Sequence, residues 1–419
     1  MTDTYIVHGD IIHAPALDAI EHIPDGYVAV RGGRVAGIYG ELPAEYAHMP
    51  LHDYRGRLVT QALCDMHLHA PQYPMLGMGI DLPLLEWLNT YTFATEARFD
   101  DVEYARRVYD ALAAKLVSVG TTRVCMFSSV HTDSTLALMQ ALEDAGISGY
   151  VGKVNMDRNC PLSIREDTER SIAETERFID EALKRFKRVR PIITPRFTPA
   201  CSDDLMTRLG ELARASALPI QSHMSENADE CAWVLELCPD CSAYWETYHK
   251  RGLFGEKTIV AHCVFSDEAE RAAIARCGAW VAHCPDSNVN LCSGVAPLRK
   301  MLDERLNVVL GSDIAGGAQL SMLQVAAMAV KSAKLRSIAT GGAEGCISAT
   351  EALYLATSAG QVFFGEQPGF AQGNEFHAIV IDDRALQAPP SMSPSDRIGR
   401  ALYTTESADI EAVYACRKL

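Results

Sequence analysis

Side chains that commonly bind metals stand at the C-terminal ends of several apolar, β-rich runs, and this placement constrains the fold more than any other feature. His67 and His69 close one such run, two residues apart. Because side chains alternate along a strand, both imidazoles should point to the same face. His223 and His262 each end a further run, and Asp313 follows another. The chain is therefore expected to bring the C-terminal ends of several strands together at one place.

The middle of the chain alternates β-rich runs with helical patterns. Apolar residues recur at a helical spacing over Val102 to Val117, Glu169 to Phe186 and Leu205 to Ala215. The expected strands between such stretches end at His69, Met126, Val154, Phe197, His223, His262, His283 and Asp313. Eight strands that alternate with helices predict an α/β fold, a (β/α)8 TIM-type barrel, whose active site lies at the C-terminal ends of the strands.

Both ends of the chain contain short β-rich runs rather than helical patterns. They are Tyr5 to Val7, Tyr27 to Val30, Val35 to Ile38, Ala378 to Ile381 and Val413 to Ala415. These runs predict a small β-sandwich domain built from residues 1–61 and 374–419, with the barrel formed by residues 62–373. The connection from His69 to Asp101 is unusually long, so it is expected to lie over the barrel mouth as a lid.

Composition restricts the classes of partner. The 419 residues carry a formal net charge of −16, which repels nucleic acid and anionic lipid, so neither is expected as a partner. The thirteen cysteines are odd in number and scattered, which is not typical of a disulfide framework. The N-terminus lacks a signal-peptide pattern, and no apolar run reaches about 18 residues. We therefore expect a cytoplasmic protein.

The residues at the strand ends have the chemistry of a metal site. Neutral imidazole and carboxylate are zinc ligands, and a bound divalent metal lowers the pKa of its water to about 7. A single histidine at a strand end is more often a hydrogen-bonded core residue. Burying several imidazoles and a carboxylate without a cation is costly, however. The sequence therefore predicts a metal site formed by His67, His69, His223, His262 and Asp313.

Two further residues are candidates for chemistry beside this site. His283 ends its own run and should lie between His262 and Asp313, where it would bind the attacking water or polarise the leaving group. Its alternative role is that of a core histidine. Glu226 follows His223 by three residues, and such a carboxylate is suited to moving a proton between water and a ring nitrogen. An acidic residue at a helix N-terminus is the alternative for Glu226.

Several motifs carry a resemblance to known families. The segment 65–69, the strand ends at His223 and His262, and the segment 311–313 resemble the amidohydrolase superfamily over nearly the whole chain. Other segments are similar to the guanine deaminases within it: 67–73, 80–88, 194–197, 221–227 and 312–317. The stretches DLPLLEWL and TPRF among them are the discriminating ones, since other members share only the metal motif.

The resemblance implies a cofactor and an assembly. One zinc ion per subunit would be bound by His67, His69, His223 and Asp313. His262 also belongs to the metal-site residues of this pattern, and in some members it contacts the water or the leaving group more than the metal. The protein would be a homodimer.

The resemblance also implies a substrate. Gln72 would contact the purine edge, Arg196 would donate to the guanine carbonyl oxygen, and Phe197 would pack on the ring. Because arginine has only donors, it favours a carbonyl over the amino group that adenine carries there. The expected substrate-binding residues are His69, Gln72, Arg196, Phe197, His223, Glu226 and Asp313.

The resemblance finally implies a reaction. Hydroxide generated with the help of Asp313 would attack C2 of guanine while Glu226 protonates a ring nitrogen, yielding xanthine and ammonia. The residues assigned to catalysis are Glu226, Asp313, His262 and His283. Two alternatives stay open: deamination of another aminated heterocycle, such as a pterin, an oxidised guanine or a triazine, and a metal-free scaffold protein.

The chain departs from the superfamily pattern in two places. Residues 60–64 stand where a Pro-Gly turn is usual, and His377 stands where an aspartate is common. Neither position belongs to the predicted chemistry.

Overall fold

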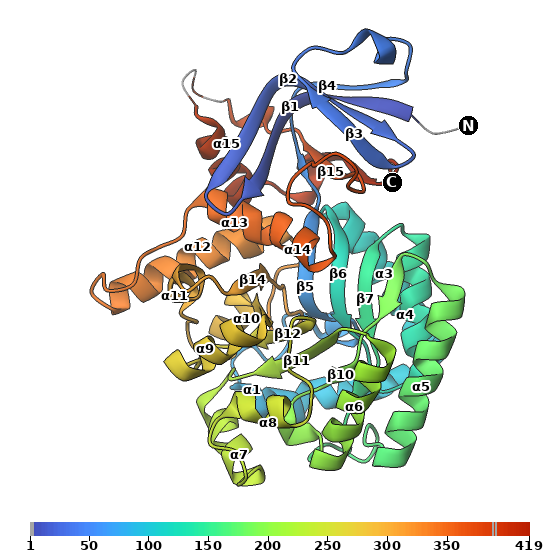
Figure 1. Ribbon diagram of the computed structural model, residues 1–419, viewed down its shortest axis with the longest axis vertical. Helices are drawn as coiled ribbons and strands as arrows, with labels where there is room; N and C mark the ends of the chain where they lie inside the picture. Colours follow the sequence, from blue (N-terminus) through green and yellow to red (C-terminus); the bar gives the residue numbers. More distant parts are fainter. Residues whose placement is uncertain (1–3, 388, 390–391) are drawn as a thin grey trace.

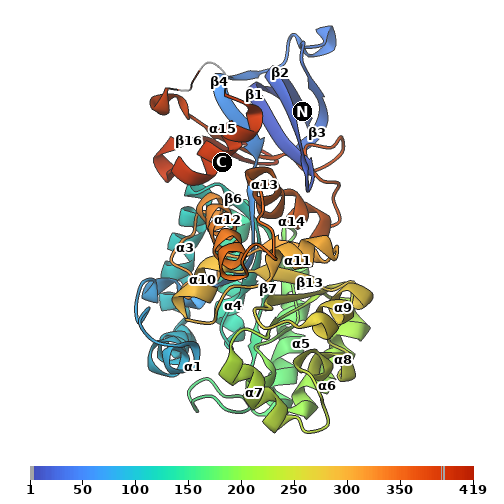
Figure 2. The same cartoon turned by 90° about the vertical axis from the view of Figure 1, so that its left-hand side faces the viewer.

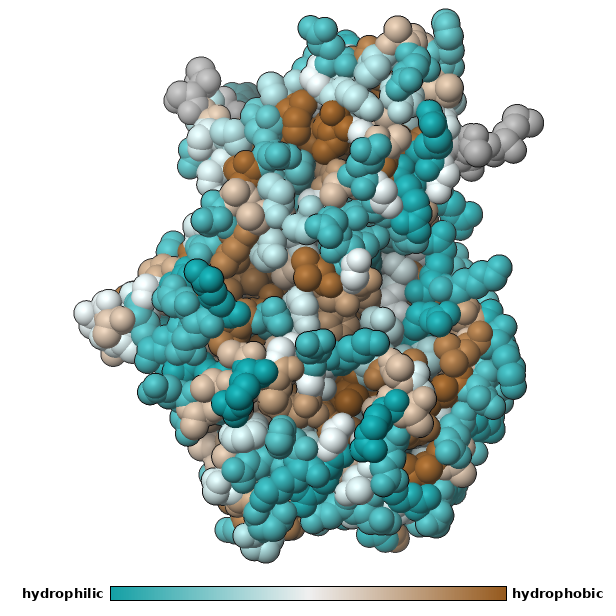
Figure 3. Space-filling model, in the orientation of Figure 1, coloured by the Kyte–Doolittle hydropathy of each residue, from teal (hydrophilic) through white to brown (hydrophobic). Residues whose placement is uncertain are grey.

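The computed structural model describes residues 4–387, 389 and 392–419. A sheet made from strands near the two ends of the described chain lies on a larger α/β body (Figure 1). Figure 2 shows the same division from the side. The face seen in Figure 3 is mostly hydrophilic, with apolar patches between the polar groups. Among the described residues, no helix is long and apolar enough to cross a membrane.

The larger body is built around parallel strands. They are β5 (Leu63–His69), β6 (Thr121–Phe127), β7 (Ser148–Gly152), β8 (Val154–Asn155), β9 (Val189–Pro191), β10 (Thr194–Pro195), β11 (Ile220–Met224), β12 (Thr258–His262), β13 (Trp280–His283) and β14 (Asn307–Leu310). Two ladders, β5-β6-β7-β9 and β11-β12-β13-β14, hold most of them, and β8 pairs with β10. The third and fourth expected strands are each broken into two short pieces, β7 with β8 and β9 with β10.

Backbone hydrogen bonds outside the regular ladders close them into a barrel. The N–H of Gln221 donates to the carbonyl of Ile193 at 2.9 Å, which joins the two ladders on one side. On the other side the N–H of Asp313 donates to the carbonyl of His67 at 2.8 Å. The last strand region thus meets the first, and the TIM-type barrel expected from the sequence is confirmed.

Helices cover the outside of the barrel and the region near the terminal sheet. They are α3 (Val102–Ser118), α4 (Thr132–Asp144), α5 (Thr168–Arg185), α6 (Asp203–Ser216), α7 (Ala228–Leu237), α8 (Tyr244–Lys250), α9 (Glu268–Cys277), α10 (Pro285–Asn290), α11 (Leu298–Asp303), α12 (Met322–Ala339), α13 (Ala349–Ala356), α14 (Ser358–Phe363) and α15 (Pro394–Thr404). Asp101 caps α3 by accepting from the N–H groups of Glu103 and Tyr104. One face of α3, including Tyr109 and Leu112, is fully buried, as its apolar spacing predicts.

The long connection after β5 is largely helical. It contains α1 (Leu84–Trp87), a π-helical turn (Leu88–Thr92) and α2 (Phe93–Ala97). Trp87 and Phe93 are buried in an apolar cluster together with Phe127 and Phe197. Figures 1 and 2 place α1 at the end of the barrel opposite the terminal sheet. The segment therefore forms a packed cover over the strand ends rather than an open loop.

The terminal strands differ in one respect from the expectation. They are β1 (Thr4–Ala16), β2 (Ala19–Arg31), β3 (Arg34–Tyr39), β4 (Leu51–Gln61), β15 (His377–Ile381) and β16 (Ile410–Ala415). They form a single six-stranded sheet in the order β16-β15-β4-β1-β2-β3, so the expected sandwich of two sheets is corrected to one. Register shifts within β1 and β2 bend these long strands, and one bent sheet can enclose an apolar cluster by itself.

Candidate metal centre and adjoining pocket

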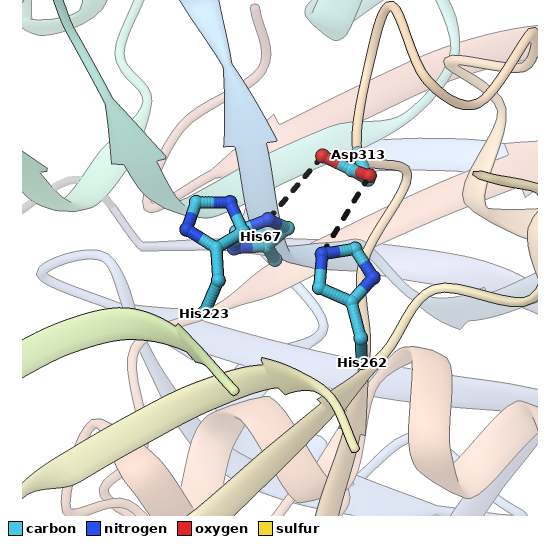
Figure 4. Close-up of side chains that lie close together, drawn as sticks. All are labelled: His67, His223, His262 and Asp313. Atoms are coloured by element: carbon cyan, nitrogen blue, oxygen red, sulfur yellow. Dashed lines mark ion pairs between the residues drawn. The ribbon is translucent and has the colours of Figure 1, made fainter. Parts of the chain in front are cut away.

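Four of the predicted metal ligands meet at the end of the barrel (Figure 4). One possible ligand atom from each of His67, His223, His262 and Asp313 lies within 4.8 Å of the others. His67 comes from β5, His223 from β11, His262 from β12, and Asp313 from the loop that follows β14. All four side chains are buried. The strand ends therefore converge as the sequence predicts.

His69 completes this group from the same strand as His67. Its Nε2 atom lies 3.0 Å from Nε2 of His223 and 3.4 Å from Oδ1 of Asp313. Nε2 of His67 lies 3.3 Å from the same carboxylate oxygen. Contacts of 3.0–3.4 Å between donor atoms are the spacing found among ligands about 2 Å from one ion.

Hydrogen bonds fix the orientation of two of the imidazoles. Nδ1 of His223 donates to the carbonyl oxygen of Arg196 at 2.6 Å, and Nδ1 of His262 donates to the side-chain oxygen of Asn288 at 2.9 Å. The proton is held on Nδ1 in each ring, so the lone pair of Nε2 faces the centre. Outer partners of this kind are typical of histidines that bind metals.

The centre contains buried nitrogens that the protein itself leaves unsatisfied. Nε2 of His67 and Nε2 of His262 accept or donate no hydrogen bond within the described residues. Burial lowers the pKa of His67 and lowers the pKa values of His69 and His223 well below their usual range, so these rings are neutral. Neutral, buried and unpartnered nitrogens beside a carboxylate are costly without a cation. The arrangement fits a metal-binding centre.

The carboxylate of the centre is held in its ionised form. Burial by itself raises the pKa of Asp313, but the polar contact with Nε2 of His67, 3.3 Å away, and the nearby His262 outweigh it and lower the pKa to about 2. The backbone there is held in the left-handed region, with φ of 48° at Asp313 and 76° at His262. Such strain persists where surrounding contacts enforce it, which is common at functional sites.

Asp65 makes contacts that hold this strained backbone in place. The sequence alone gave Asp65 no role. Its two carboxylate oxygens accept from the N–H of Ser312 at 2.9 Å and from the hydroxyl of Ser312 at 2.5 Å. Burial raises the pKa of Asp65 to about 7. The side chain ties β5 to the residue that precedes Asp313. It thereby positions the ligand Asp313 without being one of the clustered ligands itself.

A pocket opens beside the metal centre. Its wall combines apolar side chains with polar groups that converge on one side: His69, Gln72, Leu84, Trp87, Leu88, Arg196, Phe197, His223, Glu226, His262, Leu291 and Asp313. Every predicted substrate-binding residue is among them. Leu84, Trp87 and Leu88 belong to the long connection that the sequence predicts over the barrel mouth, but none of the three was predicted individually as a pocket residue.

Glu226 faces the centre rather than a helix. Its Oε2 atom lies 3.5 Å from Nε2 of His262, and the hydroxyl of Ser293 donates to its Oε1 at 3.4 Å. The following helix, α7, is capped by Asn227 and Glu230 instead, so the role at a helix N-terminus is filled by other residues. Burial, with the nearby charges of Asp313 and Glu230, raises the pKa of Glu226 well above its usual range. Such a carboxyl can hold a proton near neutral pH.

Two predicted substrate contacts share a third residue. Gln72 donates to Oε1 of Glu96 at 3.0 Å, and Arg196 donates to both oxygens of Glu96 at 2.5 and 3.0 Å. All three side chains are buried. Glu96 lies on α2, about one hundred residues from Arg196 in the chain, so no sequence spacing signals this contact.

His283 lies apart from the pocket wall. It is 1% exposed, and neither ring nitrogen has a hydrogen-bond partner among the described residues. Burial, followed by the charge of His262, lowers the pKa of His283 to about 3. The ring is therefore neutral and near the centre, but it is absent from the residues that line the pocket.

Comparisons with known proteins agree with this geometry. A model of the amidohydrolase family matches residues 58–407. Guanine deaminase from Mus musculus is 38% identical over 385 residues, covering 89% of this chain and 84% of the relative. Guanine deaminase from Escherichia coli K12 is 34% identical over 375 residues, covering 88% of this chain and 83% of the relative. A solved guanine deaminase from C. acetobutylicum with bound guanine superposes with a TM-score of 0.97 at 41% identity, covering 99% of this chain and all of that one.

Proposed function

Because the chain belongs to the amidohydrolase family, we propose that it is a guanine deaminase, which hydrolyses guanine to xanthine and ammonia. The observation that carries this proposal is the pocket beside the metal centre. Its lining includes two donor side chains, Arg196 and Gln72, a buried carboxyl, Glu226, and an aromatic ring, Phe197, which supports the proposal. A flat heterocycle with acceptor atoms on one edge fits this arrangement.

The proposed cofactor is one zinc ion per chain. His67, His69, His223 and Asp313 would hold it, and His262 would lie beside it through its free Nε2. The unpartnered nitrogens and the single carboxylate support this assignment, since imidazole and carboxylate are zinc ligands. When bound, zinc lowers the pKa of a water molecule to about 7 and so provides a nucleophile at neutral pH.

Recognition would rest on Arg196, Gln72 and Phe197. Arg196 donates to the carbonyl oxygen of guanine, Gln72 contacts the purine edge, and Phe197 packs on the ring. The guanidinium has no acceptor, so an amino group at the carbonyl position leaves donors facing donors. Apolar side chains from the long connection, Trp87 and Leu84, line the pocket and would exclude water from the bound substrate. Together these contacts favour an oxopurine.

Glu226 would move the protons. It accepts a proton from the water that attacks C2 and delivers it to the adjacent ring nitrogen of guanine. A second proton, returned through Glu226 or Asp313, leaves with the amino group as ammonia. Guanine and one water are thereby converted to xanthine and ammonia. The raised pKa of Glu226 supports this role, because a proton carrier works best when its pKa lies near the operating pH.

His283 is proposed to act on this water or leaving group from behind the pocket wall. Its neutral ring and its unpartnered nitrogens support such a contact. His283→Asn should then lower kcat while the metal content and the KM for guanine stay unchanged. Unchanged kcat would assign His283 to the core instead.

The experiment for the whole proposal is turnover of guanine by the purified, zinc-loaded protein, followed by ultraviolet absorbance and by ammonia release. A pterin, an oxidised guanine and an aminated triazine serve as competing substrates. Preferred conversion of guanine supports the proposal. Faster turnover of another heterocycle would replace guanine as substrate, and no turnover of any of them with metal bound would favour the scaffold alternative.

Two further proposals concern the protein in the cell. We propose a cytoplasmic location, supported by thirteen cysteines that are all free thiols in the described chain, as in a reducing compartment. We also propose a homodimer, on the family resemblance alone. Sedimentation analysis of the purified protein tests the homodimer, and a sedimenting monomer would reject it.

A further inference from the structure

We infer that Glu96 is a positioning residue that sets the specificity of the pocket, by orienting Arg196 and Gln72 so that both present only hydrogen-bond donors to the substrate. This inference rests on the proposed function, since it concerns the same pocket. None of the sequence motifs includes Glu96, and it does not line the pocket itself.

The contacts of Glu96 join the two recognition residues. The carboxylate is 2% exposed and holds the guanidinium of Arg196 with both oxygens, Nη1 to Oε2 at 2.5 Å and Nη2 to Oε1 at 3.0 Å. Oε1 also accepts from Nε2 of Gln72 at 3.0 Å. A two-point contact fixes the plane of the guanidinium as well as its position. The ring of Phe93, 5.2 Å from the guanidinium carbon, restrains the same group from another side.

The orientation of Gln72 follows from two opposite contacts. Its Oε1 accepts from the backbone N–H of Ala315 at 3.1 Å, while its amide nitrogen donates to Glu96. A flipped amide would place its NH2 against the N–H of Ala315 and its oxygen against the carboxylate, so both contacts would be lost. The amide oxygen is thus occupied, and one N–H is left for the pocket.

The side of the pocket that faces the substrate edge therefore presents only hydrogen-bond donors. Arg196 has no acceptor, and the acceptor of Gln72 is turned toward Ala315. A substrate that offers a carbonyl oxygen and an unprotonated ring nitrogen there can pair with both residues. An analogue with an amino group in place of the carbonyl brings donors together and leaves buried groups unpaired, which is the strongest basis of discrimination in a polar pocket.

Glu96 also neutralises a buried charge. Arg196 is 3% exposed, and a buried cation without a partner is strongly unfavourable. The carboxylate of Glu96 supplies this partner through both of its oxygens, at 2.5 and 3.0 Å from the guanidinium nitrogens. Glu96 therefore holds the charged recognition group in one place in the pocket wall.

The test compares Glu96→Gln with the unaltered protein, using guanine and 2,6-diaminopurine, in which an amino group replaces the carbonyl. In the variant the amide at position 96 offers one acceptor and one donor, so Gln72 loses its fixed orientation. The KM for guanine should rise about 10- to 100-fold, with kcat changed less than about threefold. The preference for guanine over 2,6-diaminopurine, as the ratio of kcat/KM values, should narrow at least about tenfold.

Two other variants keep the test decisive. Glu166→Gln is the matched control, because Glu166 forms a buried ion pair with Lys153 at 2.6 Å outside the pocket. It should leave KM and the substrate preference unchanged. Glu96→Asp retains the charge on a shorter side chain, which is unable to reach both partners, and it should give intermediate values even if Glu96→Gln fails to fold.

The outcomes separate the two proposals. If the unaltered protein does not turn over guanine, the proposed function and this inference both fail. If it does, and either folded Glu96 variant keeps the original KM and preference, the inference alone is overturned. A fall in kcat with unchanged KM would likewise overturn it, because that pattern belongs to the chemistry rather than to positioning.

Discussion

The described part of the chain contains two clusters of side chains that can bind metals, and they differ in what satisfies them. In the centre at the barrel mouth, the buried Nε2 atoms of His67 and His262 make no hydrogen bond, although carboxylate oxygens lie 3.3 and 3.5 Å from them. The second cluster consists of Glu375, His377 and Cys416 at the edge of the terminal sheet. Its ligand atoms lie as close together as those of the first.

Every member of the second cluster already has a partner. His377 contacts the hydroxyl of Thr122 through Nδ1 at 2.8 Å. Arg188 donates to the thiol of Cys416 at 3.7 Å, and Arg34 lies 3.5 Å from the carboxylate of Glu375. Two guanidinium groups already occupy positions beside these atoms, which disfavours a metal cation there. Since both clusters contain residue types that bind metals, the metal site is defined by ligand atoms that make no hydrogen bond to the protein. We therefore expect one metal ion per chain.

The largest effect on metal binding is expected for Asp313→Asn. The substitution keeps the size of the side chain but removes the one carboxylate among the ligands. We expect metal content to fall from one ion to below about 0.1 per chain and guanine turnover to become undetectable, because ligand charge sets the affinity of the centre. Elemental analysis and turnover measure both. Cys416→Ser should retain one ion per chain; if it lost the ion instead, the assignment of the two clusters would be reversed.

Glu226→Gln separates chemistry from metal binding within the first cluster. The amide has nearly the same shape but carries no titratable proton, so kcat should fall about 10²- to 10⁴-fold. Metal content and thermal stability should stay close to those of the unaltered protein. Steady-state kinetics with elemental analysis check this expectation. A variant that lost its metal would show Glu226 to be a ligand, contrary to the proposal.

Removal of the metal should destabilise the barrel, because the ion stabilises the folded protein where it is bound, at the centre at the barrel mouth. A ligand present at about 1,000 times its Kd stabilises the folded state by about 4 kcal/mol. A chelator should therefore lower the Tm of the unaltered protein and have no effect on Asp313→Asn, which binds no metal. Calorimetry with and without chelator provides the measurement. An equal decrease of Tm in both proteins would contradict the assignment.

In the second cluster, which is expected to bind no metal, acid should lower the free energy of unfolding through protonation of His377. Burial, with the charge of Arg123, lowers the pKa of His377 to about 3, against about 6.5 in an unfolded chain. The unfolded state then binds one more proton between these pH values. The contribution of His377 to stability is complete above pH 6.5 and is lost as the pH falls toward 3.

The variant that tests this is His377→Asn, which removes the titrating group. The free energy of unfolding should then depend on pH less steeply between pH 3 and 6.5, by at most about 1.4 kcal/mol per pH unit. Chemical denaturation at several pH values measures the slope, with His249→Asn, an exposed histidine, as the control. An unchanged slope for His377→Asn would show that this histidine does not titrate across that range.

The sequence predicts the barrel well because several of its strands end at residues that can bind one metal ion. Side-chain alternation places His67 and His69 on one face, and parallel strands bring His223 and His262 to the same edge. These arguments require only local periodicity and the rule that barrel strands are parallel. The bent terminal sheet was not predictable in detail, since hydrogen bonding between β4 and β15 joins segments more than 300 residues apart.

The supporting contacts of the site are the part that the sequence does not reveal. Glu96 holds Arg196, Asn288 holds His262, and Asp65 holds Ser312. In each pair the residues lie on different strands, loops or helices, so nothing in their spacing indicates contact. Their roles depend on tertiary packing, which fixes both distance and orientation.

The seam of the barrel has a consequence for synthesis of the protein. His67 and Asp313 meet through a hydrogen bond between the first and last strand regions, and both face the metal centre. Nearly the whole barrel sequence separates them. A growing chain on the ribosome therefore lacks a complete ligand set until its last barrel strand has emerged and docked. Tight metal capture becomes a late event of biogenesis, and chains truncated before residue 313 are denied the stabilisation that the ion gives.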